Sequence, residues 1–202
     1  MNQPIAPDAF TAQEPLVLRQ DCAGITTLTL NRPKQYNALS SAVLTELQNN
    51  LDAIAQDSTV RVVVIAGSGS AFCAGHDLKE MRGQYELGAT QALFDQCSGV
   101  MQTLIALPQP VIAKVHGLAT AAGCQLVAQC DLAIASSNAT FATSGINVGL
   151  FCSTPSVALS RNLARKEAMQ MLLTGEFIDA KTAKEYGLVN RVVAPEKLDD
   201  EL

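Results

Sequence analysis

Two glycine-rich stretches carry the residue types best suited to chemistry. The first runs from Gly67 to Leu78, follows a β-branched run and contains His76 and Asp77. Open α/β sheets bind ligands at such turns, outside the carboxyl ends of their strands. The stretch lacks both the Gly-Lys-Ser/Thr ending of a P-loop and the G-x-G-x-x-G spacing of a dinucleotide site. It therefore predicts a ligand site of another kind.

The second stretch begins at Gly117, and nearly every residue from Leu118 to Ala128 is small or apolar. A helix starting near Ala121 would be apolar all round and would lie inside the protein. Its first N–H groups have no partner within the helix, and the helix dipole adds partial positive charge there. Such a buried N-terminus can hold negative charge on a ligand. A tightly packed core helix is the alternative interpretation.

The remaining chain must position these two stretches. Short apolar or β-branched runs predict strands at 16–19, 25–30, 60–66, 111–115, 131–135 and 189–193. Apolar residues at helical spacing predict helices at 43–55, 93–105, 155–163 and 166–173, with N-caps at Ser40 or Ser41 and, for a further helix, at Asp179. Residues 82–90 are predicted to be flexible and 141–149 to form a loop. These β-α units predict a mostly parallel sheet flanked by helices.

Composition predicts one domain with a full core, because 48% of the 202 residues are hydrophobic and only 16% are charged. Part of this apolar excess is expected to face another subunit. The net charge is -5 and the 14 basic residues are spread thinly, so neither nucleic acid nor a membrane is an expected partner. No apolar run reaches the roughly 18 residues that span a bilayer.

The cysteines are expected to be reduced, because none of the six forms a C-x-x-C pair. Residues 1–14 show neither a signal sequence nor a transit peptide, so a cytoplasmic location is expected. No metal site is expected, because His76 and His116 lack partners at ligand spacing.

Four segments, taken together and in order, resemble the crotonase superfamily, the enoyl-CoA hydratase and isomerase fold. They are Asn31–Pro33 with Asn37–Leu39, Ala71–Leu78, residues 110–131, and Leu173–Gly175 with Gly187–Val189. The resemblance implies an α/β crotonase (ClpP/crotonase-like) fold built from repeated β-β-α units. It divides the chain into a flexible arm at 1–15, a core domain at 16–194 and the start of a C-terminal helical region at 195–202, which continues in family members. Leu118–Gln125 and Asn147–Pro155 are most similar to one subgroup of the superfamily.

The resemblance implies that the backbone N–H groups of His76 and Ala122 hold the thioester oxygen of an acyl-CoA as it gains enolate charge. Coenzyme A would be part of the substrate, with no other cofactor, and the protein would form a homotrimer or a dimer of trimers. The residues expected to contact the substrate are Lys34, Tyr36, Ala74, Gly75, His76, Asp77, Leu78, Lys79, Gly123 and Asn147.

The sequence departs from the family pattern at two positions. Family hydratases activate water with two glutamates, and those positions here are Gln125 and Gly145. Neither side chain can take a proton at neutral pH, so efficient hydration is not expected. Other superfamily members place variable catalytic groups in the segment that holds Ser144, Asn147, Cys152, Ser153 and Thr154. Cys152 could act as a nucleophile there only with a lowered pKa and a nearby base.

Several side chains have a structural interpretation beside the chemical one. His76 could carry protons, or only its backbone could matter. His116 and Asp131 are expected to make structural hydrogen bonds, Asp77 to cap a helix, and Glu80 to be a solvated charge.

Three functions are weighed. The first is an enzyme acting on acyl-CoA by isomerisation, decarboxylation, thioester hydrolysis or weak hydration. The second is a catalytically silent acyl-CoA-binding protein. The third is a serine protease of the ClpP type, which Thr120 and the two histidines of the chain disfavour.

Overall fold

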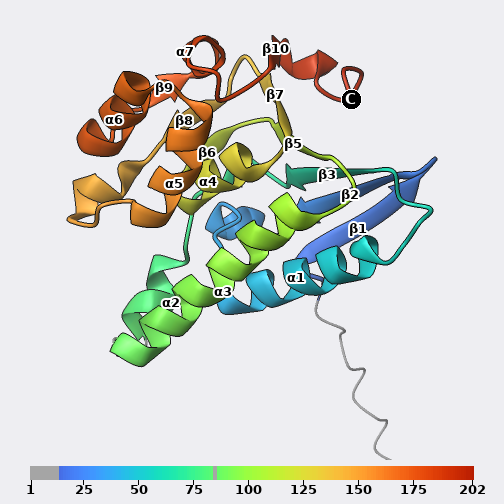
Figure 1. Cartoon of the computed structure of the whole chain (residues 1–202), viewed down its shortest axis with the longest axis horizontal. Coiled ribbons are helices and arrows are strands. Elements are labelled where there is room, and N and C mark those ends of the chain that lie inside the picture. The colour runs from blue at the N-terminus through green and yellow to red at the C-terminus, as the bar shows by residue number, and fades with distance from the viewer. Residues whose placement is uncertain (1–13, 84–85) are drawn as a thin grey trace, which may run out of the picture.

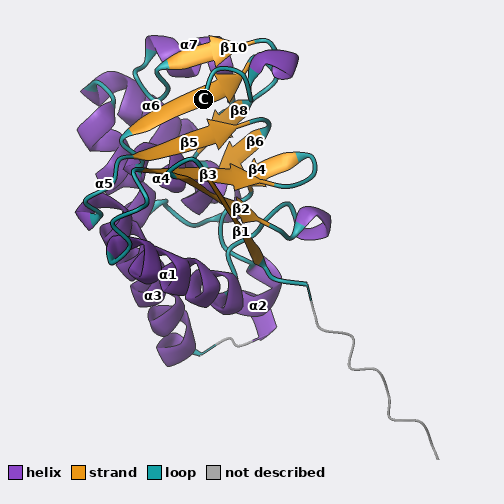
Figure 2. Cartoon of the chain, turned by 90° about the vertical axis from the view of Figure 1, so that its right-hand side faces the viewer, coloured by secondary structure: helices purple, strands orange, loops and turns teal. Residues whose placement is uncertain are grey.

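The computed structural model describes residues 14–83 and 86–202, so the arm predicted for residues 1–15 falls outside it except for its last two residues. The strands form two sheets (Figures 1 and 2). The larger sheet has the order β1-β2-β3-β5-β7-β10, formed by Val17–Cys22, Ile25–Leu30, Val62–Gly67, Val111–Val115, Leu132–Ser136 and Arg191–Val193. Only its β1–β2 pair is antiparallel, which confirms the mostly parallel sheet.

The smaller sheet has the order β4-β6-β8-β9, formed by Ala71–Cys73, Leu118–Thr120, Thr140–Ala142 and Ile178–Asp179. Its strands β4, β6 and β8 directly follow β3, β5 and β7 in the chain, and they pair in parallel. Each of these strand pairs therefore gives one strand to each sheet before the chain turns away. This arrangement is the repeated β-β unit of the predicted crotonase fold, and the fold class is confirmed.

Periodicity does not reveal the smaller sheet, because strands of two or three residues are too short to show alternation. Residues 67–78, predicted as one turn, contain β4, and residues 141–149, predicted as a loop, contain most of β8 and the 3-10 helix η2 (Ser144–Val148). Residues 82–90, predicted to be flexible, are largely helical where the structure describes them. That segment holds the end of α2 (Leu78–Gly83) and the start of α3 (Leu87–Ala106), and only residues 84–85 lie outside the described range.

Two long helices, α1 (Ser41–Ala55) and α3, lie side by side on one side of the strands (Figure 2). The predicted cap of α1 is confirmed, because the Ser40 hydroxyl accepts a hydrogen bond from the N–H of Val43 at 3.3 Å. The remaining helices are η1 (Pro33–Gln35), α4 (Ala122–Gln129), α5 (Ser153–Asn162), α6 (Arg165–Thr174), α7 (Ala180–Glu185) and η3 (Pro195–Lys197). The Asp179 cap of α7 is also confirmed. The helix expected near Pro195 is only the short η3.

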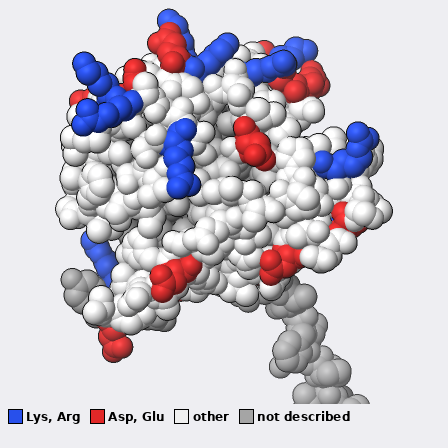
Figure 3. Space-filling model, in the orientation of Figure 1, with Lys and Arg blue, Asp and Glu red and all other residues white. Residues whose placement is uncertain are grey.

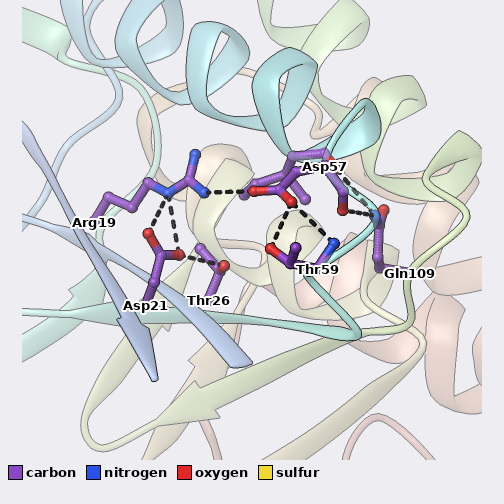
Figure 4. A network of polar contacts seen from close by, with 7 residues as sticks. Arg19, Asp21, Thr26, Asp57, Thr59 and Gln109 are labelled. Atoms are coloured by element: carbon purple, nitrogen blue, oxygen red, sulfur yellow. Dashed lines mark hydrogen bonds and ion pairs between the residues drawn. The ribbon is translucent and has the colours of Figure 1, made fainter. Parts of the chain in front are cut away.

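A polar network joins the β1–β2 hairpin to the loop after α1 (Figure 4). The Arg19 guanidinium lies 3.0 Å from the Asp21 carboxylate and 3.6 Å from that of Asp57. Hydrogen bonds from Thr26 and Arg19 lower the pKa of Asp21, and those from Thr59 lower the pKa of Asp57. Since these charges are solvent-exposed, the network orients the hairpin more than it stabilises the fold.

Charged side chains of both signs are scattered around a broad uncharged area on the face shown in Figure 3. Within the described ranges, no helix has the length and apolarity to cross a membrane, and no cluster of three metal-ligating side chains occurs. All six cysteines are free thiols.

Glycines allow α4 to approach the smaller sheet closely. A Cβ at Gly123 would lie 2.7 Å from the carbonyl carbon of Cys73 and 2.9 Å from its Cβ. A Cβ at Gly117 would lie 2.5 Å from the carbonyl oxygen of Ser70. No side chain fits such gaps. At Gly123 the backbone of α4 therefore packs directly against β4, and at Gly117 the backbone before β6 packs against the residue before β4.

We expect Gly123→Ala to lower the free energy of unfolding by about 1–3 kcal/mol, because the added methyl group forces the two backbones apart. The matched control is Gly99→Ala in α3, where a Cβ meets nothing within 4 Å. That change should raise the free energy of unfolding by about 0.5–1 kcal/mol through helix propensity. Urea denaturation of both variants measures the difference, and equal effects would contradict the close packing.

Candidate active site

An apolar cavity of about 170 Å³ lies where the end of β4, the start of α4 and the segment before α5 meet. Its walls come from Ala74, His76, Leu78 and Met81, from Phe94 of α3, from Ala121 and Ala122, and from residues between 144 and 155. Among the described residues, no Asp, Glu, Lys or Arg lines it. The cavity thus unites both glycine-rich stretches with the polar cluster at 144–154.

Two residues whose backbone N–H groups have no hydrogen-bond partner within the described ranges meet at this cavity. His76 forms an isolated parallel bridge with Leu39, but the hydrogen bonds use the carbonyl of Gly75 and the N–H of Asp77, so the His76 N–H takes no part. Ala122 is the first residue of α4, and its N–H has no acceptor within the helix. A Cβ at Gly75 would lie only 3.2 Å from the Ala122 nitrogen, so the two segments are in contact.

The turn into α4 is held in a strained conformation. Ala121 has φ +50° and ψ −119°, a backbone conformation that favours glycine. Its N–H donates to the Ala142 carbonyl at 2.9 Å, and its own carbonyl accepts from Gln125 at 3.0 Å. Strand β8 and helix α4 together therefore fix the direction of the first helical N–H groups.

Asp77 supports the site rather than facing it. Its carboxylate lies 2.9 Å from the Arg32 guanidinium and accepts the N–H groups of Lys79 at 3.0 Å and Glu80 at 3.2 Å. Burial opposes ionisation, but the Glu80 N–H and Arg32 outweigh it and hold the pKa of Asp77 below its usual value. The predicted capping role is confirmed.

Asn37 fixes the η1 segment against the glycine-rich turn, a role that its place in a sequence motif does not reveal. Its amide donates to the carbonyls of Ser68 at 2.8 Å and Ala71 at 2.7 Å, and it is 1% exposed. Nearby, the Ala74 N–H donates a hydrogen bond to the Tyr36 carbonyl at 3.0 Å. Lys34 and Tyr36 consequently lie beside the cavity segment, with both side chains exposed.

His76 contributes a side chain as well as a backbone group to the cavity. Its ring packs on Phe94 with the centroids 4.7 Å apart, and its Nε2 is buried without a hydrogen-bond partner among the described residues. Burial lowers the pKa of His76, while the nearby Glu80 carboxylate raises it by a smaller amount. The imidazole is therefore neutral at neutral pH. Phe94 is predicted from sequence only as an apolar helix position, and its place in the cavity wall was missed.

Cys152 and Gly145 face each other across the 144–155 segment. Burial raises the pKa of Cys152 despite a hydrogen bond from the Gly145 backbone, which disfavours the thiolate that a nucleophile needs. A Cβ at Gly145 would lie 2.5 Å from the Leu150 carbonyl oxygen and 2.7 Å from the Cys152 sulfur. The loop in this conformation has no room for a larger residue at position 145.

Three further candidate residues turn away from the cavity. Gln125 is 4% exposed, does not line the cavity, and has an Oε1 without a partner among the described residues. Gly123 contacts Cys73, as described above. The Asn147 amide donates to the Gly175 carbonyl at 3.3 Å and so links η2 to the end of α6.

The remaining polar candidates have structural partners. His116 Nε2 donates to the Gly69 carbonyl at 2.9 Å, and the Asp131 carboxylate accepts the Val111 N–H at 2.8 Å, as predicted. The Thr120 hydroxyl donates to the Ala74 carbonyl at 3.0 Å, so it forms no serine-protease-like pair with a histidine. Glu80 is not the solvated charge expected, because it accepts the hydroxyl of Ser41 at 2.7 Å and its N–H at 3.0 Å.

Comparison with known protein families shows to which family the chain belongs. The family model described as enoyl-CoA hydratase/isomerase matches residues 20–202. The chain belongs to the enoyl-CoA hydratase/isomerase family. Among solved structures, this member of the family superposes on an enoyl-CoA hydratase of Mycobacterium smegmatis with a TM-score of 0.91 and 61% identity, covering 93% of this chain and 74% of that one.

The subgroup that Leu118–Gln125 and Asn147–Pro155 resemble is enoyl-CoA hydratase domain-containing protein 3, and the comparisons confirm it. The Xenopus laevis protein of that name is 49% identical over 187 residues, 93% of this chain and 64% of its own length. The human protein's structure gives a TM-score of 0.89 at 46% identity, covering 92% of this chain and 74% of that one. This family member thus spans less than two thirds of the Xenopus relative.

The predicted cytoplasmic location is contradicted. The relatives from Xenopus laevis, Danio rerio, Rattus norvegicus and Homo sapiens are all named mitochondrial. The prediction rested partly on reduced thiols, which do not separate one reducing compartment from another.

We expect His76 to make this family member less stable as the pH falls. Because burial lowers its pKa from 6.5, the unfolded chain binds the proton more readily, so this contribution to stability is full above pH 6.5 and is lost as the pH falls from there through the lower pKa of the folded state. Burial lowers the pKa of His116 as well, so His76→Gln should reduce the loss and a double substitution of both histidines should reduce it further. Urea unfolding between about pH 7.5 and 5.5 measures this, and an unchanged slope in His76→Gln would contradict it.

Proposed function

We propose that the cavity binds the acyl thioester of an acyl-CoA and that the N–H groups of His76 and Ala122 hold its oxygen while enolate charge develops. The observation that carries this proposal is the meeting of two unpaired backbone donors at an uncharged, apolar cavity. Donors fixed in a water-poor site stabilise developing charge better than water does, and one such donor is typically worth about 3 kcal/mol of barrier.

The two parts of an acyl-CoA match two different surfaces. Leu78, Met81 and Phe94 give the cavity an apolar wall suited to the acyl group. The coenzyme A portion would extend towards the exposed Lys34 and Tyr36, which adjoin Ala74 through the Tyr36 carbonyl. Coenzyme A enters as part of the substrate, and the proposal requires no other cofactor.

Efficient hydration is not part of this proposal. By the resemblance to the family, the positions of the two hydratase glutamates correspond to Gln125, which is outside the cavity wall, and to Gly145, which has no side chain. Without an acid/base pair, activation of water loses a factor of about 10²–10⁴ for each missing group. Enolate chemistry by isomerisation, decarboxylation or thioester hydrolysis fits better, and a catalytically silent acyl-CoA-binding protein is the alternative.

A trimer, or a dimer of trimers, belongs to the same proposal. Large apolar side chains are exposed around η2, α5 and α6: Val148, Leu150, Phe151, Val157, Met169, Leu173 and Phe177. Exposed apolar groups gathered in one region mark contact surfaces. Sedimentation analysis should then give three or six times the mass of one chain, whereas a monomer would contradict this part.

Acetoacetyl-CoA tests the paired donors, because it ionises to an enolate with its own ultraviolet absorbance. We expect the protein to bind it as the enolate at neutral pH. Ala122→Pro removes one N–H at a helix position that accepts proline, so it should weaken enolate binding by about 10²–10³-fold. Titration followed by absorbance measures both effects.

The matched control is Arg165→Pro, which places proline at the first position of α6 outside the cavity wall. It should leave enolate binding unchanged. If the unaltered protein binds acetoacetyl-CoA no better than free coenzyme A, or if Ala122→Pro binds the enolate normally, the proposed function is wrong.

We expect restoring the glutamates not to restore hydration. In Gly145→Glu the new side chain collides with the Leu150 carbonyl and the Cys152 sulfur, so the variant should be less stable and, with Gln125→Glu, still slow on crotonyl-CoA. Loss of the conjugated thioester absorbance measures the rate. Rapid hydration by the unaltered chain would contradict the interpretation of both positions.

A further inference from the structure

The cavity wall contains only two titratable side chains among the described residues, His76 and Cys152. The thiol is protonated at neutral pH, because burial raises its pKa. The imidazole is neutral there and carries a free electron pair, which is the form that a general base needs.

The placement of the His76 side chain points to a ligand. Its Nε2 is buried and has no hydrogen-bond partner among the described residues, and a buried polar atom without a hydrogen bond destabilises a protein. Phe94 of α3 packs on the ring and fixes its orientation. The charged group that acts on the ring is Glu80 of α2, which Ser41 holds by two hydrogen bonds, while Asp77 is paired with Arg32. Nε2 of His76 thus has no hydrogen-bond partner among the described residues, and a bound acyl ligand or its acidic C–H group can supply one.

The same residue also offers the backbone N–H to the thioester oxygen. A carbonyl oxygen held by that N–H would place the adjacent carbon, Cα of the acyl group, in the same cavity that His76 lines. Proximity of this kind is what proton transfer to a positioned base requires.

Resting on the proposed function, we propose that His76 is the catalytic base of this cavity and moves a proton on and off Cα of the bound acyl-CoA. The Cα–H bond breaks and its proton passes to Nε2. The electron pair of that bond becomes the carbon–carbon π bond of the enolate, and the carbonyl π pair moves to the oxygen held by the two N–H groups.

Return of the proton completes a balanced cycle. Delivery to Cα regenerates the thioester, with exchange if the imidazolium has exchanged its proton with solvent. Delivery to Cγ of a 3-enoyl thioester gives the 2-enoyl isomer. The neutral imidazole is restored in both cases and no co-reactant is consumed. A single histidine therefore takes over the proton transfer for which the cavity has no carboxylate.

The test measures exchange of the Cα protons of butyryl-CoA in deuterated water by proton NMR, beside isomerisation of 3-hexenoyl-CoA by absorbance. His76→Gln keeps the backbone N–H and removes the titrating group. We expect it to lower both rates by at least about 100-fold while binding of acetoacetyl-CoA enolate changes little. In His76→Ala, added free imidazole should restore part of the exchange, which a purely structural role would not allow.

The matched control is His116→Gln, which removes the other histidine of the chain, outside the cavity wall. It should exchange at the unaltered rate. Exchange by His76→Gln at the unaltered rate would overturn the proposal, as would enolate binding by the unaltered protein without any exchange of butyryl-CoA. Both of these results leave the proposed binding of acyl-CoA standing, whereas failure to bind acetoacetyl-CoA overturns both.

Discussion

The direct packing of β4 on the first turn of α4 is the constraint on which the site depends. Gly123 lies against the backbone of Cys73, and Gly75 lies against Ala121 and Ala122. A side chain at either glycine would separate the two segments. Their contact brings together two N–H groups from distant parts of the sequence, and among the described residues neither has a hydrogen-bond partner.

A second layer of polar residues holds these segments without entering the cavity. Arg32, Asn37 and Asp77 bind one another or nearby backbone groups, and they tie the η1 turn to the glycine-rich stretch. The charges of Arg32 and Asp77 are paired with each other outside the cavity wall, which itself carries no charged side chain among the described residues. The same burial that strengthens a fixed N–H donor also disfavours ions, which is why the pKa of His76 falls and that of Cys152 rises.

In the proposed mechanism, backbone N–H groups stabilise charge and side chains transfer protons. This separation explains how the family member can depart from the hydratase pattern. The oxyanion donors proposed here are main-chain groups, so their geometry does not depend on the side chains at positions 76, 125 or 145. Proton-transfer groups are side chains and can be exchanged separately. In the proposed correspondence with family hydratases, the carboxylate positions hold Gln125 and Gly145, while a histidine occupies the proposed donor position itself. Under the proposed function, the cavity keeps a means of stabilising charge and differs from the hydratases in the group that moves protons.

The sequence by itself determined the longer strands and helices and the family to which the chain belongs. Strands β2, β3 and β5, helices α1 and α3, and the caps Ser40 and Asp179 follow from local patterns, and four ordered motifs indicate the crotonase fold. Only the tertiary structure revealed the smaller sheet, because strands of two or three residues exist through their partners rather than through periodicity. It also decided that Asn147 and Gln125 lie outside the cavity wall and that Phe94 lies within it. The direction of a side chain depends on packing between elements far apart in the chain, which no local pattern records.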